Sequence, residues 1–312
     1  MIPTAEELQK TSVRINNFIH KTPVLSSKNI NEIAGCSVYF KCENFQKMGA
    51  FKMRGASNAI LKLTNEQQQN GVITHSSGNF GQAVALSAKL CNIKATIIMP
   101  SNAPAVKKEA VKGYGATIIE CKPTLEAREA TANAIVKSTG ATFLHPYNCY
   151  NVIAGNSTAT IELLEQKNQL DSIIAPIGGG GLISGTALAC NYFSNVKVYG
   201  AEPKGADDAF RSFKEGKIIP MDNPNTIADG LRTSLGDKGF DIIMKHVSDI
   251  FTCEESEIIE AMKLIWERMK IIIEPSCAVP LAVLLKNKDH FKSQKVGIII
   301  TGGNVDLSKL PF

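Results

Sequence analysis

The sequence predicts an α/β protein with two open, mostly parallel twisted sheets and helices on both faces. The first observation is that short apolar strand-like segments alternate with helical segments between residues 71 and 121. The second is a strand–helix–strand pattern over 171–201, which contains four consecutive glycines at 178–181. Alternation of this kind is typical of parallel strands joined by helical crossovers. With 312 residues, 44% of them hydrophobic, the chain is long enough to bury a sizeable core.

The first half of the chain begins with a helical segment. Thr4 followed by Glu7 matches a capping box, so we expect a helix that runs to about His20. A strand is expected over 37–42, and a helix over 53–63 with its apolar residues on one face. The alternating stretch then gives strands at 72–75, 95–99 and 117–120, and helices at 78–90, 105–114 and 124–139.

The second half of the chain also alternates between strand-like and helical segments. A helix is expected over 153–166, followed by a buried strand at 171–177, a helix at 182–190 and a strand at 196–201. Apolar residues at helical spacing over 254–270 indicate a core-facing or dimer-facing helix. The apolar run 295–301 reads as a buried strand that ends in the hydroxyl of Thr301. Ligand crevices in open parallel sheets lie beyond the carboxyl ends of the strands, which is where this hydroxyl is expected.

The glycine run sits where a strand hands over to a helix. Four residues without a Cβ let the backbone approach a ligand closely, and N–H groups at a helix start favour an anion such as phosphate. A dinucleotide fingerprint fails in both possible registers, because Ile183 or Ser184 falls at the last glycine position. Glu202 at the end of the next strand keeps that alternative open. The Walker pattern fails, because no Gly-Lys-Ser/Thr follows the run.

Lys52 opens the helix expected after residue 51, directly behind Ala50 and Phe51. Most lysines are solvated surface residues, but an amine desolvated at a helix N-terminus loses part of its preference for the charged form. A neutral amine is the form that attacks a carbonyl to make an imine. An enzyme that holds a phosphorylated aldehyde needs both such an amine and an anion cradle. Lys52 and the glycine run together supply them.

Charge and cysteine usage exclude several classes of protein. The net charge is +5, but Lys and Arg are spread along the chain without a basic, aromatic-rich patch, so no nucleic-acid partner is expected. The eight cysteines form no C-x-x-C pair, which argues against zinc and redox motifs. Acidic residues stand near the N-terminus where a signal peptide is basic, and no apolar run approaches 18 residues. We therefore expect a cytoplasmic protein without a membrane span.

Four motifs occur in an order that resembles a known family. They are Gly-Ala-Phe-Lys-Met-Arg-Gly at 49–55, Ser-Ser-Gly-Asn-Phe-Gly at 76–81, the four glycines, and Thr-Gly-Gly-Asn at 301–304. The chain resembles, over nearly its whole length, the pyridoxal-phosphate enzymes of fold type II, which include serine/threonine dehydratases and serine racemases. The similarity is greatest to the eukaryotic serine racemases. The resemblance implies a large domain of residues 1–64 plus 149–312 and a small domain of residues 65–148.

The resemblance also assigns roles to residues. Lys52 is expected to form the imine with pyridoxal 5'-phosphate and to act as the base on one face of the substrate, with Ser77 on the opposite face. Asn79 is expected to bind the cofactor's phenolic oxygen, and Thr301 its pyridine nitrogen. The phosphate is expected to bind the backbone N–H groups of Gly178, Gly179, Gly180, Gly181 and Leu182.

Further expectations concern a metal ion, a nucleotide and a second subunit. Glu202, Asp208 and the carbonyl of Ala206 match the family's site for Mg²⁺, or Ca²⁺ or Mn²⁺, although paired carboxylates on a turn are usually just solvated. Relatives bind ATP as an activator at a homodimer interface, and Lys47 and Lys107 stand at matching places.

The implied activity is the interconversion of L- and D-serine, with β-elimination of serine to pyruvate and ammonia. The alternative is an L-serine/L-threonine dehydratase with little racemase activity. Ser77 favours the racemase, because many threonine dehydratases have Ala in that place. Two positions depart from the family: Phe80 replaces a frequent His, and Tyr147 stands where some serine racemases have Asn. We assign no role to Tyr147 from the sequence.

Overall fold

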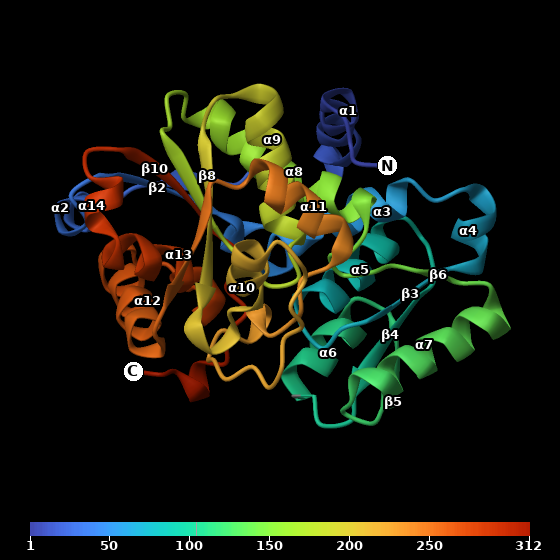
Figure 1. Ribbon diagram of the computed structural model, residues 1–312. Helices are drawn as coiled ribbons and strands as arrows, with labels where there is room; N and C mark the ends of the chain where they lie inside the picture. The colour runs from blue at the N-terminus through green and yellow to red at the C-terminus, as the bar shows by residue number, and fades with distance from the viewer. Residues whose placement is uncertain (104) are drawn as a thin grey trace.

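The computed structural model describes residues 1–103 and 105–312 and contains two β-sheets (Figure 1). In the six-stranded sheet only β1 is antiparallel to its neighbour β2, and the four-stranded sheet is parallel throughout. The predicted α/β class with open, mostly parallel sheets is therefore confirmed. The six-stranded sheet has the order β1 (Val24–Leu25), β2 (Ser37–Cys42), β10 (Lys295–Ile300), β7 (Ser172–Pro176), β8 (Lys197–Pro203) and β9 (Asp249–Cys253).

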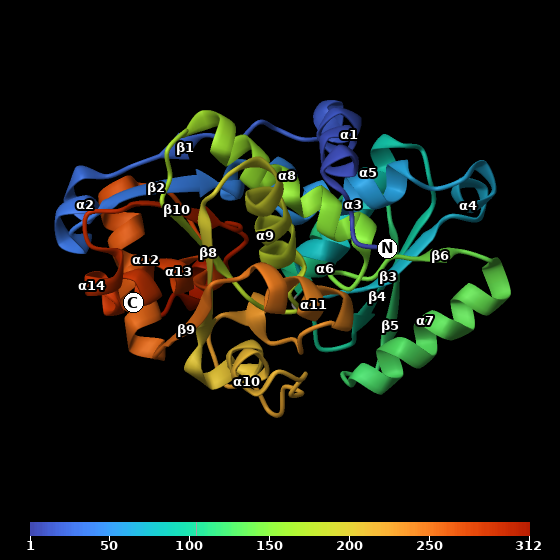
Figure 2. The ribbon, with the colours of Figure 1, turned by 45° about the horizontal axis from the view of Figure 1, so that its top comes forward.

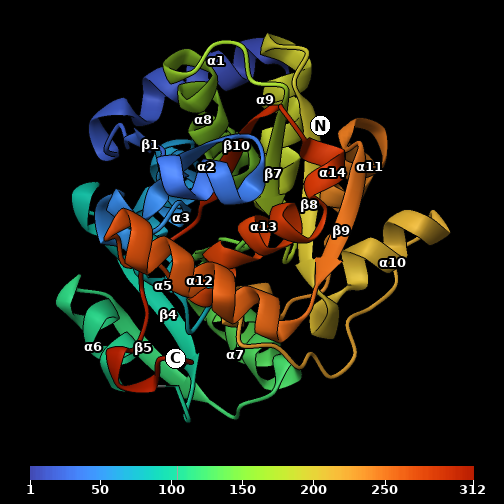
Figure 3. The ribbon, with the colours of Figure 1, turned by 90° about the vertical axis from the view of Figure 1, so that its left-hand side faces the viewer.

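Helices cover both faces of the six-stranded sheet because its strands are apolar on both sides. Successive strand residues point to opposite faces. Ile173 belongs to a core cluster with α8 (Tyr150–Gln166) and α9 (Gly181–Phe193). Its neighbour Ile174 belongs to a different cluster, with α12 (Glu255–Met269) and α13 (Pro275–Lys286). Figure 3 shows α12 and α13 on the side of the sheet that faces the viewer.

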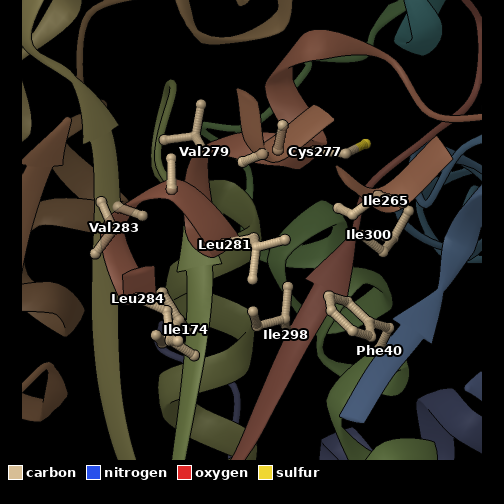
Figure 4. Close-up of a cluster of buried hydrophobic side chains, with 14 of the residues drawn as sticks. Phe40, Ile174, Ile265, Cys277, Val279, Leu281, Val283, Leu284, Ile298 and Ile300 are labelled. Atoms are coloured by element: carbon tan, nitrogen blue, oxygen red, sulfur yellow. The ribbon is translucent and has the colours of Figure 1, made fainter. Parts of the chain in front are cut away.

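The cluster beneath α13 is the largest of the core clusters (Figure 4). Leu281 from the helix points at Ile298 of the central strand β10, and both side chains are fully buried. Burial of a side chain of this size stabilises the fold by roughly 1.5–3 kcal/mol. This packing fixes the carboxyl end of β10 and the amino end of α13 against each other. Both ends carry side chains of the candidate site.

The four-stranded sheet has the order β5 (Thr117–Cys121), β4 (Ala95–Pro100), β3 (Val72–His75) and β6 (Thr142–Phe143). One face packs on α5 (Asn79–Leu90) and α3 (Lys52–Leu61) through a cluster that includes Ile60, Val84 and Ile97. The other face packs on α7 (Leu125–Thr139), the green helix at the lower right of Figure 2. Helix α6 (Ala105–Gly113) follows β4.

We propose that the chain divides into a large unit, residues 1–64 plus 149–312, and a small unit, residues 65–148. All strands of the four-stranded sheet fall within the small unit, which supports this division. Helix α3 lies before the boundary, yet its Ala56 and Ile60 pack in the core of the small sheet. The helix that begins with Lys52 therefore contacts both units.

The N-terminal helix is shorter than expected. Helix α1 (Ala5–Ile15) ends well before His20 and continues only as a 3₁₀ turn, Asn16–Phe18. The predicted capping box is half correct. The Thr4 hydroxyl accepts the N–H of Glu7 at 3.3 Å, but the Glu7 carboxylate instead binds Arg14 and Lys62. Two long basic side chains within reach outweigh the single return contact to Thr4.

Several elements were not predicted. No element was expected from the sequence in the stretches that form helices α10 (Asp208–Glu215) and α11 (Asp237–His246), strand β9 and helix α13. The short helices α2 (Lys28–Ala34), α4 (Asn65–Asn70) and α14 (Lys288–Phe291) were not predicted either. None of the described helices is long and apolar enough to cross a membrane.

Candidate functional site

Lys52 lies at the first turn of α3, which is tied to the end of β10. The Phe51 N–H donates to the carbonyl of Thr301 at 2.9 Å, and Ala50 pairs with Gly302. The Lys52 ammonium donates to the carbonyl of Pro146 at 2.9 Å. Burial lowers the pKa of Lys52 to about 8, although the charge of Glu274 opposes the shift. A sizeable neutral fraction therefore exists near neutral pH, as imine chemistry requires.

A polar cluster around the buried Glu274 stands beside Lys52. Asn79 begins α5, and its amide nitrogen donates to both carboxylate oxygens of Glu274 at 3.0 and 3.1 Å. The Asn79 oxygen accepts a hydrogen bond from the side chain of Asn304 at 2.8 Å. Burial raises the pKa of Glu274 to about 7, so its carboxyl group can carry a proton near neutral pH. The amide of Asn79 is thus held from both ends.

The sequence analysis assigned no role to Glu274. The sequence does indicate that a helix begins here, because proline is frequent at the first helical position and Glu274 directly precedes Pro275. What the sequence cannot show is that Asn79, 195 positions earlier, is its hydrogen-bond partner. That contact depends on how the two sheets sit together.

Thr301 follows β10 at the carboxyl end of the sheet and is nearly buried. Its hydroxyl lies 3.0 Å from the sulfur of Cys277, which also contacts both backbone groups of Gly302. Burial raises the pKa of the Cys277 thiol, so it stays protonated. The hydroxyl is therefore held by a neutral partner, and no carboxylate contacts it among the described residues. Cys277 was not expected to take part in the site.

The glycine run forms the turn between β7 and α9, as predicted. Gly180 has φ +88°, a conformation that favours glycine. A Cβ on Gly179 would lie 2.3 Å from the ring of Tyr147, and one on Gly181 would lie 3.0 Å from the same residue. The N-terminus of α9, including Leu182, begins here, so the backbone N–H groups of this turn are suited to hold a phosphate. The turn is narrow because Tyr147 lies against it.

Ser77 is located in the loop between β3 and α5 and is half-buried. Its hydroxyl has no hydrogen-bond partner among the described residues. The neighbouring Ser76 hydroxyl, in contrast, accepts the N–H of Gly78 at 3.3 Å. Of the two serines in the motif, Ser77 is thus the one whose hydroxyl is not used to shape the loop.

Glu202 and Asp208 are both buried, at the end of β8 and the start of α10. The carboxylate of Glu202 accepts the N–H groups of Ala209 and Phe210 at 3.2 and 2.7 Å. One Asp208 oxygen accepts the Leu235 N–H at 2.7 Å, and the other is buried without a partner among the described residues. Burial, and then the charge of Asp208, raise the pKa of Glu202.

Comparison with known proteins decides the family. The model of the pyridoxal-phosphate dependent enzyme family matches residues 15–302. The chain belongs to this family. The dinucleotide alternative that Glu202 had left open is thereby excluded, and the expected cofactor is that of the family.

Relatives within this family cover the chain almost completely. The serine racemase of Dictyostelium discoideum is 50% identical, over 98% of this chain and 96% of its own. The β-hydroxyaspartate dehydratase of Paracoccus denitrificans is 48% identical, over 100% and 99% of the two chains. The solved structure of maize serine racemase aligns with a TM-score of 0.97 at 46% identity, over 99% and 95% of the two chains.

Proposed function

We propose that the protein is a pyridoxal-phosphate-dependent serine racemase that also eliminates the β-hydroxyl of serine to give pyruvate and ammonia. The observation that carries this proposal is the Lys52 amine, whose pKa is lowered to about 8, in a chain half identical to a serine racemase over nearly its full length. The similarity to both a racemase and a dehydratase of this family fits racemisation and elimination alike.

The residues present fit the cofactor. Lys52 offers an amine for its aldehyde, Asn79 an amide for its phenolic oxygen, and Thr301 a neutral hydroxyl for its pyridine nitrogen. The glycine turn offers backbone N–H groups for the phosphate, those of Gly178, Gly179, Gly180, Gly181 and Leu182. A Cβ at any of the four glycines would lie within 3.0 Å of neighbouring atoms. When bound, the cofactor supplies an electron-withdrawing ring that makes the Cα proton of the amino acid acidic.

Two side chains are proposed to move that proton. Lys52 takes it from Cα on one face, because its amine is neutral for part of the time near neutral pH. Ser77 exchanges a proton on the opposite face, which racemisation requires and elimination does not. Its hydroxyl is suited to this role because it is free of other contacts. Asn79, whose amide is held by Glu274 and Asn304, would help to hold the cofactor between these two side chains.

The test is to incubate the enzyme with L-serine and to measure D-serine and pyruvate together. Ser77→Ala should lower D-serine formation by roughly 10²- to 10⁴-fold, the usual worth of acid–base help, while pyruvate formation survives. Ser76→Ala is the matched control, because that hydroxyl shapes the loop and its loss should affect both products alike. Parallel loss of both products in Ser77→Ala would show that Ser77 only positions the loop.

A second candidate function is a dehydratase with little racemase activity, acting on L-serine or L-threonine. The similarity to a β-hydroxyaspartate dehydratase gives this class a specific basis and adds hydroxyaspartate to the substrates that the assay should include. An enzyme that forms pyruvate from L-serine and never D-serine, with Ser77 intact, would be assigned to this second function.

We further propose that Glu202, Asp208 and the carbonyl of Ala206 hold Mg²⁺, or Ca²⁺ or Mn²⁺. Two buried like charges and an unpartnered Asp208 oxygen fit a cation between them. Ala206 is buried in the turn that joins the two acids. No group of three or more His, Cys, Asp or Glu side chains that could hold a metal occurs in the described ranges, so the backbone carbonyl is needed.

The remaining proposals concern assembly and location. A homodimer is supported by exposed apolar side chains, among them Phe45, Ile272 and Leu307, which a second copy could cover. ATP as an activator is proposed from the family alone, since Lys107 already pairs with Asp229. A cytoplasmic location is supported by the eight cysteines, which are all free thiols. Sedimentation of the purified protein tests the dimer.

A further inference from the structure

One segment of the site has no role in the proposal above. Residues His145, Pro146, Tyr147 and Asn148 form the connection between β6 and α8. Each of the last three contacts a different part of the site. The Pro146 carbonyl accepts a hydrogen bond from Lys52, and the Tyr147 ring lies against the glycine run. We call residues 145–148 the bridging turn.

Asn148 anchors the far end of the bridging turn. Its side-chain nitrogen donates to the carboxylate of Asp237 at 2.6 Å, and its oxygen accepts the N–H of Lys238 at 3.0 Å. Both partners lie in the first turn of α11. The Gly236 N–H, just before that helix, donates to the carbonyl of Gly179 at 3.2 Å. The bridging turn, α11 and the glycine run are therefore held to one another.

His145 holds the bridging turn in shape. Its Nδ1 accepts the N–H of Asn148 at 2.9 Å and lies 3.4 Å from the N–H of Tyr147. Its ring packs edge-on against the Tyr147 ring, with 4.6 Å between centroids. A nitrogen that accepts two backbone N–H groups carries no proton, so the proton of the neutral ring is on Nε2. The tautomer follows from the backbone contacts alone.

The surroundings favour the neutral ring. Burial, and after it the charges of His75, Lys52 and Lys238, together lower the pKa of His145 to about 4, against a small opposing effect of Asp237. Protonation of Nδ1 would also place a donor where two N–H groups already point. The histidine thus keeps one hydrogen-bonding pattern over the whole working range of pH.

We propose that His145 is a positioning residue whose Nδ1 folds the bridging turn and so sets where the Lys52 amine and the glycine run stand relative to each other. The inference rests on the proposed function only in taking Lys52 and the glycine run as the cofactor-holding groups. It assigns His145 no proton transfer.

Amide variants separate the two ring nitrogens. In His145→Asn the amide oxygen can take the place of Nδ1, whereas in His145→Gln the amide reaches only the place of Nε2. His145→Phe keeps the ring and removes both nitrogens. Cofactor-free protein should be titrated with pyridoxal 5'-phosphate, with the dissociation constant read from absorption. His145→Asn should bind within about threefold of the parent, while Gln and Phe should bind about tenfold or more weakly, the effect of losing backbone hydrogen bonds.

A second measurement needs no cofactor. The ¹⁵N spectrum of the cofactor-free parent should show an unprotonated Nδ1 and a protonated Nε2 at His145 from pH 6 to 9. An Nδ1–H tautomer would overturn the proposal. So would binding retained in His145→Gln but lost in His145→Asn, since Nε2 would then be the nitrogen that matters. Equal binding by all three variants, or equal loss in all three, also contradicts it.

Failure of the proposed function would look different. If the parent binds the cofactor and the variants follow the predicted order, but no D-serine forms from L-serine, the role of His145 stands and the racemase assignment falls. If D-serine forms normally while the variants bind the cofactor in another order, the reverse holds.

Discussion

The buried carboxylate of Glu43 and the partly buried carboxylate of Glu162 lie beside two cations, whereas the buried carboxylates of Glu202 and Asp208 lie beside each other. In the first region, Arg54 donates two hydrogen bonds to each glutamate, at 2.7 to 2.9 Å. Lys41 adds a contact to Glu162 at 2.6 Å. Two positive and two negative charges thus form a closed group, which we call the four-charge cluster (Lys41, Glu43, Arg54 and Glu162).

The second region, the carboxylate pair Glu202 and Asp208, has no such partner. Among the described residues neither acid forms an ion pair, and one Asp208 oxygen has no hydrogen bond at all. Backbone N–H groups supply the contacts that exist. The pair carries like charges in a place from which water is largely excluded.

The pKa of a carboxyl group is shifted in opposite directions in the two regions: it is lowered at Glu162 and raised at Asp208. Burial by itself would raise the pKa of Glu162, but its hydrogen bonds and charge interactions with Arg54 and Lys41 outweigh burial and lower it. Burial raises the pKa of Asp208 to about 6, and the backbone contacts only partly offset this. The carboxylates of the first region are thus neutralised by neighbouring cations, while the carboxylates of the second region have no cation beside them in the described part of the chain.

The largest expected effect is in the four-charge cluster. Arg54→Met leaves the buried Glu43 and the partly buried Glu162 without their main partner, which should cost about 3–5 kcal/mol of unfolding free energy. Urea denaturation of the cofactor-free protein measures it. Adding Glu43→Gln to Arg54→Met should restore part of the loss, because it removes one uncompensated charge.

The control for Arg54 is an ion pair of the same chemistry in water. Lys10 pairs with Glu6 at 2.6 Å on the surface of α1, with both side chains mostly exposed. Lys10→Met should leave the unfolding curve unchanged. An Arg54→Met protein as stable as Lys10→Met would mean that the four-charge cluster is hydrated, and the comparison would fail.

How far the sequence leads differs between the two regions. Arg54 lies in a motif beside Lys52, but its partner Glu162 is 108 positions away, and nothing local in the sequence pairs them. The contact exists because α3 and α8 cross closely. They can do so because residue 155 is glycine, and a Cβ there would collide with the Arg54 backbone. Buried charge partners of this kind depend on tertiary structure and cannot be predicted from spacing.

The carboxylate pair was predicted only through the family resemblance. Spacing alone favoured a solvated surface turn for Glu202 and Asp208, and the structure shows both to be buried. The strand and helix patterns, the glycine run and the position of Thr301 could be predicted, because periodicity and turn chemistry are local. The contacts of Glu274, Cys277 and His145 could not, because each partner comes from another segment of the fold.

The second prediction concerns pH and metal ions. The folded-state pKa of Asp208, about 6, is above its ordinary value of 3.8, so the folded protein binds this proton more tightly than the unfolded chain. Without metal, the contribution of Asp208 to stability, measured as the difference between the parent and Asp208→Asn, should therefore fall as pH rises from about 4 to 6, by an amount of the order of 3 kcal/mol. Saturating Mg²⁺ should reverse the loss at pH 7.5.

Two variants make the metal prediction specific. Asp208→Asn keeps an acceptor for the Leu235 N–H and removes one charge of the pair. It should be more stable than the metal-free parent at pH 7.5 and should not respond to Mg²⁺. Asp207→Asn, which removes an ion pair with Arg211 and a charge next to the pair but none of the proposed ligands, should still be stabilised by Mg²⁺. Thermal unfolding with and without chelator measures this. If neither pH nor Mg²⁺ changes the stability of the parent relative to Asp208→Asn, the pair behaves like solvated acids and the metal proposal fails.

The smallest expected effect is at Lys107 and Asp229, an ion pair of 2.9 Å that joins α6 to the 3₁₀ turn Asp229–Leu231. Half of the Asp229 side chain is exposed, so water and salt screen the pair, and Asp229→Asn should change the unfolding free energy by less than about 1 kcal/mol.

The charge of Asp229 should instead affect the pKa of the buried carboxyl of Glu274, which is raised first by burial and then in part by Asp229. Asp229→Asn should lower that pKa from about 7, and Lys107→Met should raise it, because Lys107 acts with the opposite sign. Carboxyl ¹³C shifts of Glu274 in the cofactor-free protein measure both changes. Shifts in the same direction for both variants would show that the pair acts on Glu274 by moving α6 and not by its charge.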